Sequence, residues 1–145
     1  MIKPTKESLS TERLAATKVC VQLTRLYAEN LRRMDSKLSS IHGLSFSDFT
    51  ILYHLSQAPL SRLRRSELAE LMGLTASAVT RSLLPLEKIG LIERQSDQRD
   101  ARIAYASLTP SGEHVFKEAT ITAELACQDA LQTIPASLTV LLKQV

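Results

Sequence analysis

The side chains with the clearest chemical potential lie in two short polar segments, residues 75–88 and residues 96–102. In the first segment Ser77, Thr80 and Arg81 are spaced so that they lie on one face of a helix. Hydroxyl and guanidinium groups donate hydrogen bonds to the edges of bases and to phosphate oxygens. The second segment is polar and rich in arginine. These residue types indicate a protein that binds a nucleic acid through hydrogen bonds to its bases and phosphates.

A turn between two short helices positions the first segment. Leu68, Leu71 and Met72 place apolar groups on one helix face at i, i+3 and i+4. Gly73 suits the left-handed conformation that ends a helix, and Thr75 suits the N-cap of the next helix. A glycine-containing turn between two amphipathic helices is typical of the helix-turn-helix, whose second helix enters the major groove of DNA. The alternative is an ordinary corner between two helices with solvated polar residues.

The second helix is expected to bury one face and to present the other. Val79, Leu83 and Leu86 share one stripe, which predicts that they are buried. Pro85 lies inside this helix, where it removes an amide donor and crowds the carbonyl group of Arg81, so a kink is expected. A kink would redirect the residues after it. The outward face carries Ser77, Thr80, Arg81, Leu84 and Lys88.

The second polar segment lies at the tip of an expected hairpin. Residues 91–95 and 103–108 have the composition and alternation of strands, and they flank residues 96–102. A hairpin with a basic tip beside a helix-turn-helix reaches a neighbouring minor groove, where the negative potential attracts arginine. The alternative is a solvated hairpin in which Asp97 and Asp100 neutralise the arginines.

The hairpin tip, here called the wing, suggests a division of labour among three side chains. Arg99 lies nearest the tip and is expected to contact DNA directly. Asp100 is the natural partner for the guanidinium of Arg102, because carboxylate and guanidinium groups match in geometry. Asp100 and Arg102 are therefore expected to brace the wing and to lie near phosphate.

The two ends of the chain predict an oligomer. One face of a long helix over residues 8–42 is apolar, and Ala119, Ala123, Ala126 and Ala130 give the helix after Thr109 a face of small residues that allows close helix approach. The last segment, after Pro135, ends in an apolar stripe, although chain termini are usually polar and frayed. We therefore expect the terminal helices of two subunits to interleave; the alternative is that one subunit folds its own two ends together. The apolar positions are Cys20, Leu23, Tyr27, Leu31, Met34, Leu38 and Ile41 in the first helix, and Leu138, Leu141, Leu142 and Val145 in the last segment.

Several short motifs occur in a specific order and spacing. They are Gly43-Leu44-Ser45, Ser66-Glu67-Leu68-Ala69, Val79-Thr80-Arg81, Leu86 to Ile92, the Asp-x-Arg-Asp-x-Arg run from Asp97 to Arg102, and Leu108-Thr109-Pro110-x-Gly112. On these motifs the chain resembles the MarR family of bacterial transcriptional regulators. The resemblance implies a homodimer with one winged domain per subunit, a palindromic operator, and relief of repression by a small anionic or phenolic ligand or by an oxidant.

Pattern and resemblance together predict a mainly α chain with a small β-hairpin wing. The whole chain, residues 1–145, is expected to form one domain. Residues 45–109 would form the winged helix-turn-helix that binds double-stranded DNA, and residues 8–42 and 110–145 would form the dimerisation helices.

Composition agrees with this expectation and excludes several classes of protein. The net charge is +3, which suits DNA binding without proving it. There is no apolar run of eighteen residues and no signal peptide, so we expect a cytoplasmic protein without a membrane partner. The sequence shows no phosphate-binding glycine loop, no catalytic triad order and no metal motif. We therefore expect no enzyme activity, no cofactor and no metal.

The sequence contains weaker signals for the residues that would bind an effector. The resemblance places an effector cleft where the first helix, the helix from Ser45 to Gln57 and the helix after Thr109 meet the winged part. A small aromatic or anionic effector would find polar contacts there. The candidate residues are Arg25, Tyr27, Tyr53 and His54, together with His42 and His114, although an isolated histidine is more often solvated or part of the core.

Two alternatives to a ligand-released regulator remain open. Peroxide-sensing members of the family carry a reactive cysteine on the first helix, and Cys20 lies at a similar depth. Oxidation of a thiol there would separate the reading heads. However, Cys20 falls in the apolar stripe, and a buried thiol is poorly reactive. The second alternative is a winged helix that binds proteins and not DNA, although such a module would need neither the arginines of the wing nor the outward Ser77, Thr80 and Arg81.

Overall fold

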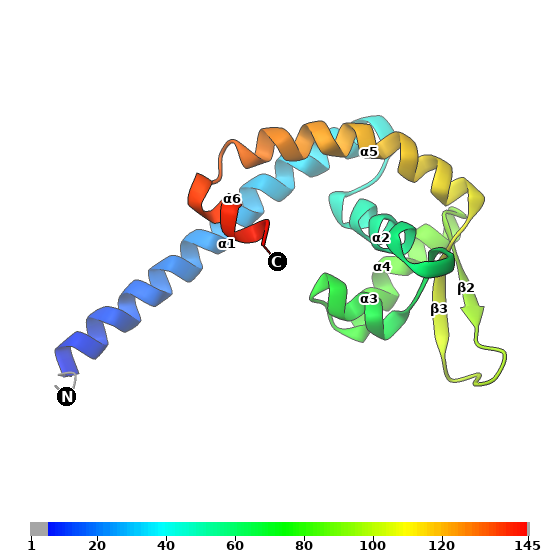
Figure 1. Ribbon diagram of the computed structural model, residues 1–145, viewed down its shortest axis with the longest axis horizontal. Coiled ribbons are helices and arrows are strands. Elements are labelled where there is room, and N and C mark those ends of the chain that lie inside the picture. Colours follow the sequence, from blue (N-terminus) through cyan, green and yellow to red (C-terminus); the bar gives the residue numbers. More distant parts are fainter. Residues whose placement is uncertain (1–5, 145) are drawn as a thin grey trace.

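The computed structural model describes residues 6–144 and contains a winged helical unit beneath a pair of long helices (Figure 1). Within those residues, none of the helices has the length and apolar character needed to cross a membrane. The elements, in order, are α1 (Lys6–His42), α2 (Phe46–Gln57), a 3₁₀ turn (Pro59–Ser61), β1 (Arg62–Arg64), α3 (Arg65–Met72), α4 (Ala76–Lys88), β2 (Ile92–Ser96), β3 (Ala104–Leu108), α5 (Pro110–Leu131) and α6 (Ala136–Leu142).

The expected fold class, mainly helical with a small wing, is confirmed. The strands β2 and β3 pair in antiparallel register and form the expected hairpin. The strand β1 was not predicted from the sequence; it adds a third strand on the other side of β3, so that the order is β1-β3-β2. Tyr105 of β3 consequently lies opposite Arg64 of β1 on one side and opposite Gln95 of β2 on the other.

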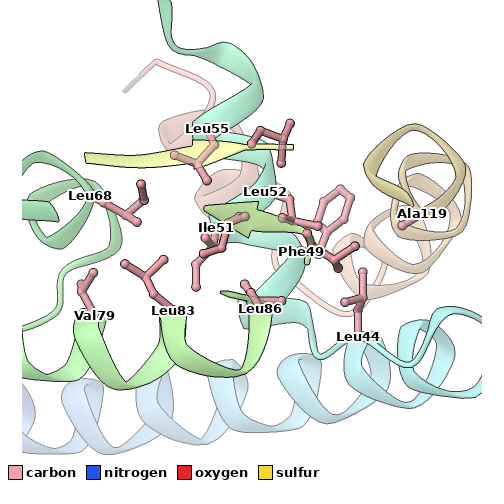
Figure 2. Packing of buried hydrophobic residues seen from close by; sticks show 14 of the residues in the cluster. Leu44, Phe49, Ile51, Leu52, Leu55, Leu68, Val79, Leu83, Leu86 and Ala119 are labelled. Atoms are coloured by element: carbon pink, nitrogen blue, oxygen red, sulfur yellow. The ribbon is translucent and has the colours of Figure 1, made fainter. Parts of the chain in front are cut away.

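The core lies between α2, α3, α4 and the sheet (Figure 2). Val79, Leu83 and Leu86 are buried, as predicted, and they face Leu68 of α3 and Ile51 of α2. The predicted apolar face of α3 was partly wrong. Leu68 is fully buried, but 55% of Leu71 is exposed. The core-facing residues of α3 are instead Leu68, Ala69 and the partly buried Met72.

The junction between the wing and α5 is built by the Thr109-Pro110-x-Gly112 motif. Thr109 caps α5 by accepting a hydrogen bond from the Gly112 amide on its hydroxyl oxygen at 3.0 Å. The same hydroxyl donates to the carbonyl oxygen of Gly90 at 2.6 Å, just after α4. A Cβ atom on Gly112 would lie only 1.9 Å from the carbonyl oxygen of Leu91. The start of α5 is thereby fixed to the end of α4 by hydrogen bonds and by very close backbone contact.

The second half of α1 packs against α5. The small-residue face predicted for α5 is confirmed, because Ala119, Ala123, Ala126 and Ala130 are all buried. Of the predicted stripe on α1, only Leu38 is fully buried in this chain, and 47% of Leu23, 66% of Tyr27 and 66% of Ile41 are exposed. Figure 1 shows that the first half of α1 extends beyond α5, where α6 crosses it and covers only part of its apolar face.

The C-terminal helix α6 crosses α1 and leaves apolar side chains at the surface (Figure 1). Leu138 is partly buried, whereas 61% of Leu141 and 58% of Leu142 are exposed. Val145, the last residue of the predicted stripe, lies outside the described residues. The dimerisation stretches predicted as residues 8–42 and 110–145 therefore correspond to α1 and to α5 with α6.

Candidate nucleic-acid interface

The turn between α3 and α4 has the geometry that the sequence predicts. Gly73 adopts φ +63°, in the left-handed region, and its amide is hydrogen-bonded to the end of α3. Thr75 caps α4, with its hydroxyl oxygen accepting a hydrogen bond from the Ala78 amide at 3.2 Å. The chain therefore reverses within three residues and presents the first turns of α4 at the surface.

The residues proposed to meet base edges lie on the outer side of α4. Ser77 and Arg81 are exposed, and Thr80 is half-buried beside Val79. The helix remains continuous through Pro85 to Lys88, which is exposed in the last turn. Pro85 therefore does not end the helix, and the kink expected at this residue stays a prediction.

Leu84, also on the outer side of α4, is 54% exposed. Most of this side chain thus remains accessible to a partner and is not packed under the wing. Because it follows Arg81 by less than one turn, Leu84 offers an apolar contact next to the polar residues that the sequence selected.

A half-buried ion pair fixes α4 relative to α3, and the sequence analysis did not find it. Arg65 donates from Nη2 to Glu87 Oε1 at 2.9 Å, with only 19% and 23% of the two side chains exposed. Arg65 begins α3 and Glu87 lies in the last turn of α4. The pair therefore joins the outer ends of the two helices and holds the angle at which α4 faces outward.

The conformation of the wing tip depends on Asp97. Its Oδ1 atom accepts hydrogen bonds from the amides of Arg99 at 2.7 Å and Asp100 at 3.1 Å. Its Oδ2 atom lies 3.4 Å from the Tyr105 hydroxyl, which donates to it. These backbone hydrogen bonds, with a smaller contribution from Tyr105, hold the pKa of Asp97 below its ordinary value. From the sequence Asp97 was expected only to neutralise the arginines, whereas in the structure its hydrogen bonds fix the conformation of the tip.

Asp100 and Arg102 are in contact, as the sequence suggested, but not in a two-pronged arrangement. Arg102 Nε lies 3.4 Å from Asp100 Oδ1, and the same oxygen accepts the Arg102 amide at 2.9 Å. The Arg102 side chain is 94% exposed and Arg99 is also exposed. The wing therefore presents two accessible guanidinium groups on a backbone held by two aspartates.

Two further arginines come from β1. Arg62 places its guanidinium carbon 4.8 Å from the centre of the Tyr105 ring, and that of Arg64 lies at 5.9 Å. The Arg64 Nε atom is 3.5 Å from the Tyr105 hydroxyl, to which it donates. These two positions could not be predicted from the sequence, because β1 is only three residues long and is too short for an alternating pattern.

The structure gives the four effector candidates different surroundings. Arg25 pairs with Glu29 one turn further along α1, and its side chain is 73% exposed. Tyr53 and His54 contact each other edge to face, with 5.4 Å between their ring centres. Burial lowers the pKa of His54. Tyr27 is the one that borders an apolar groove, so the four side chains do not converge on one ligand position.

That apolar groove, of about 420 Å³, lies between α1, α5 and α6 and also touches the start of α2. The other histidines lie elsewhere: His42 is hydrogen-bonded to Thr122 at 2.8 Å, and His114 lies beside Glu118. Cys20 is exposed in this chain, so its own subunit does not cover the part of the apolar stripe on which it lies. The groove is lined by Leu23, Leu26, Tyr27, Asn30, Met34, Phe46, Cys127, Ala130, Leu131, Ile134, Leu138 and Leu142.

This arrangement of helices and sheet defines a winged helix-turn-helix protein. Residues 42–103 match the model of the MarR family. The chain is a member of this family of transcriptional regulators, as its motifs suggested. It is 31% identical over 115 residues to the uncharacterized HTH-type transcriptional regulator YwaE of Bacillus subtilis, covering 77% of this chain and 63% of that protein. The chain thus spans less than two thirds of the length of this curated relative.

Solved structures share the fold over most of the chain. The MarR family regulator Sco3205 of Streptomyces coelicolor, solved in complex with DNA, superposes with a TM-score of 0.76 at 22% identity, covering 99% of this chain and 86% of that one. BldR of Sulfolobus solfataricus gives 0.74 at 24% identity, covering 90% and 96%. A cysteine mutant of MarR from E. coli, complexed with operator DNA, gives 0.75 at 20% identity, covering 88% and 92%.

Proposed function

We propose that this protein is a sequence-specific, DNA-binding transcriptional regulator that works as a homodimer on a palindromic operator. The observation that carries the proposal is the pairing of an outward α4, with Ser77, Thr80 and Arg81 in its first turns, with a wing that presents Arg99. A helix of this kind fits the major groove, and an arginine-bearing wing beside it would reach the adjacent minor groove. The family and the fold point to a regulator and not to an enzyme.

Base-edge contacts are assigned to Ser77, Thr80 and Arg81. Because arginine binds guanine through two hydrogen bonds, replacing Arg81 with alanine should weaken binding to the operator by roughly 1–3 kcal/mol. Binding to random DNA should change much less, so the ratio of the two affinities falls. Fluorescence anisotropy with operator and random duplexes measures that ratio. An unchanged ratio would remove Arg81 from the base-reading set, and Arg33→Ala on α1 serves as the control for loss of one positive charge.

For the wing, the expected change in DNA affinity on replacing Asp100 is opposite to the change that charge alone predicts. Arg99→Ala should weaken binding to all sequences by a similar factor and make the salt slope shallower by about one unit. Asp100→Ala should also weaken binding, although it removes a negative charge, because Asp100 holds the backbone and guanidinium of Arg102. Tighter binding by Asp100→Ala would show that Asp100 acts as a repulsive charge and does not brace the wing.

Dimerisation is proposed from the surfaces that a single chain leaves uncovered. The first half of α1 and the outer side of α6 expose large apolar side chains, including Leu23, Leu141 and Leu142. Leu23 and Leu142 line the same groove, and an apolar surface shared by several elements is typical of an interface. Two such subunits related by a two-fold axis would place two copies of α4 on two half-sites, which is why a palindromic operator is proposed.

Repression with release by a small aromatic or anionic effector is the regulatory part of the proposal. A dimer that occupies an operator excludes other proteins from that DNA. Tyr27 at the edge of the apolar groove favours an aromatic ligand. Arg25, Tyr53 and His54 stay candidates for polar contacts with an effector. Switching through Cys20 is the second candidate, because oxidation of a thiol on the proposed dimerisation surface of α1 would separate the reading heads.

The decisive experiment is a gel shift with the DNA upstream of the protein's own gene. We expect a retarded band that is competed by the same unlabelled duplex and not by random duplex. A regulator of this kind acts where the bacterial chromosome lies, in the cytoplasm. If no duplex is retarded at any salt concentration tested, the protein-interaction module becomes the better explanation of the fold.

A further inference from the structure

A polar hollow of about 630 Å³ lies between the edge strand β1 and the wing tip. It is separate from the outer face of α4, where base reading is proposed. Two of its lining side chains carry positive charge and come from different elements. The lining residues are Arg62, Gln95, Ser96, Asp97, Gln98 and Arg99.

Arg62 is held in place on one side of this hollow. Its guanidinium carbon lies 4.8 Å from the centre of the Tyr105 ring, within the range of a cation–π contact. Its Nη1 atom donates to the Gln95 side-chain oxygen at 3.5 Å. Among the residues whose side chains the structure describes, no carboxylate forms an ion pair with Arg62. The guanidinium is therefore oriented in advance and its charge is not neutralised by an acidic partner.

Asp97 is the one acidic residue lining the hollow, and its oxygens are already engaged. The amides of Arg99 and Asp100 donate to Oδ1, and the Tyr105 hydroxyl donates to Oδ2. Tyr105 in turn accepts from Arg64, so a second positive charge lies next to this carboxylate. The local balance favours an anion entering the hollow from outside.

We propose that Arg62 binds a phosphate group of the DNA backbone in this hollow, beside the minor groove that Arg99 of the wing enters. The inference rests on the proposed function and adds a contact that fixes the position of the wing on DNA. Guanidinium groups match the oxygens of a phosphodiester in geometry as well as in charge. Because such a contact does not depend on the base sequence, it contributes equally to operator and random DNA.

The test compares Arg62→Gln with the wild-type protein on a fluorescein-labelled random duplex over a series of KCl concentrations. We expect roughly three- to tenfold weaker binding and a salt slope shallower by about one unit, because one fewer phosphate is neutralised. Arg62→Lys should keep the wild-type slope, because it keeps the charge. Arg32→Gln, which removes one exposed positive charge from the α5-packed half of α1, is the matched control and should keep both slope and affinity.

Thermal melting establishes that each variant is folded, and Arg62→Met, which keeps the apolar part of the side chain, replaces Arg62→Gln if the latter does not fold. Wild-type slopes in a folded neutral variant would overturn the inference and leave the proposed function standing. Absence of DNA binding by the wild-type protein, to both random and upstream duplexes, would instead overturn the proposed function.

Discussion

Replacing Gly112 with alanine is expected to destabilise the protein by about 2–3 kcal/mol, at the upper end of the usual cost of overpacking. The new Cβ atom would lie 1.9 Å from the carbonyl oxygen of Leu91 and 2.9 Å from Leu108 Cδ1. The first of these atoms is backbone, so no change of rotamer relieves the clash. The start of α5 would have to move away from Leu91, and the hydrogen bonds of Thr109 to Gly90 and Leu91 would weaken.

Thermal and urea unfolding followed by circular dichroism measure this loss of stability. Ser111→Ala is the matched control, because Ser111 is exposed in the same turn of α5, and it should change the free energy of unfolding by no more than about 0.5 kcal/mol. If Gly112→Ala is as stable as Ser111→Ala, the close approach of α5 to Leu91 is not a feature of the folded protein.

Replacing both Leu141 and Leu142 with glutamine should abolish dimerisation and operator binding. Full burial of one leucine contributes about 1.5–3 kcal/mol, so a two-fold symmetric interface loses several such contributions at once. Each subunit alone would bind a half-site weakly. Analytical ultracentrifugation measures the oligomeric state, and anisotropy with the operator duplex measures binding.

Leu60→Gln is the matched control for this double variant, because Leu60 is 81% exposed and lies in the 3₁₀ turn before β1, away from α1 and α6. It should leave the oligomeric state unchanged. A well-folded monomeric wild-type protein, or a double variant that remains dimeric, would contradict the proposed interface.

Local signals explain why much of the helix-turn-helix could be predicted. Gly73 and Thr75 act on groups within a few residues of themselves, and Thr109 caps α5 through the Gly112 amide three residues on, so these roles can be recognised from neighbouring residues. The hydrogen bond of Thr109 to Gly90, by contrast, joins residues 19 positions apart. The periodicity of Val79 and Leu83 likewise reports the buried face of α4.

The features that were missed depend on contacts between distant residues. Arg65 and Glu87 are 22 positions apart, and nothing in either local segment indicates that they pair. The position of Arg62 over Tyr105 depends on the pairing of β1 with β3. A strand of three residues has no recognisable pattern in the sequence, so this pairing could not be predicted. The exposure of Cys20 depends on the length of α1 that α5 and α6 leave uncovered, so it was not visible in the apolar periodicity either.

The fixed junction at Thr109 and Gly112 means that a change in the tilt of α5 moves the winged unit with it. One residue separates the end of β3 from the start of α5, whose 22 residues span about 33 Å at 1.5 Å per residue. The N-terminal end of α5 is fixed to the winged unit, so the two move together. If α5 tilts by about 5° about its C-terminal end, its N-terminal end moves by about 3 Å, which is comparable to the length of a hydrogen bond. A contact that changes the angle of α5 relative to α1 and α6 would therefore also change the distance between the wing and the minor groove of the DNA.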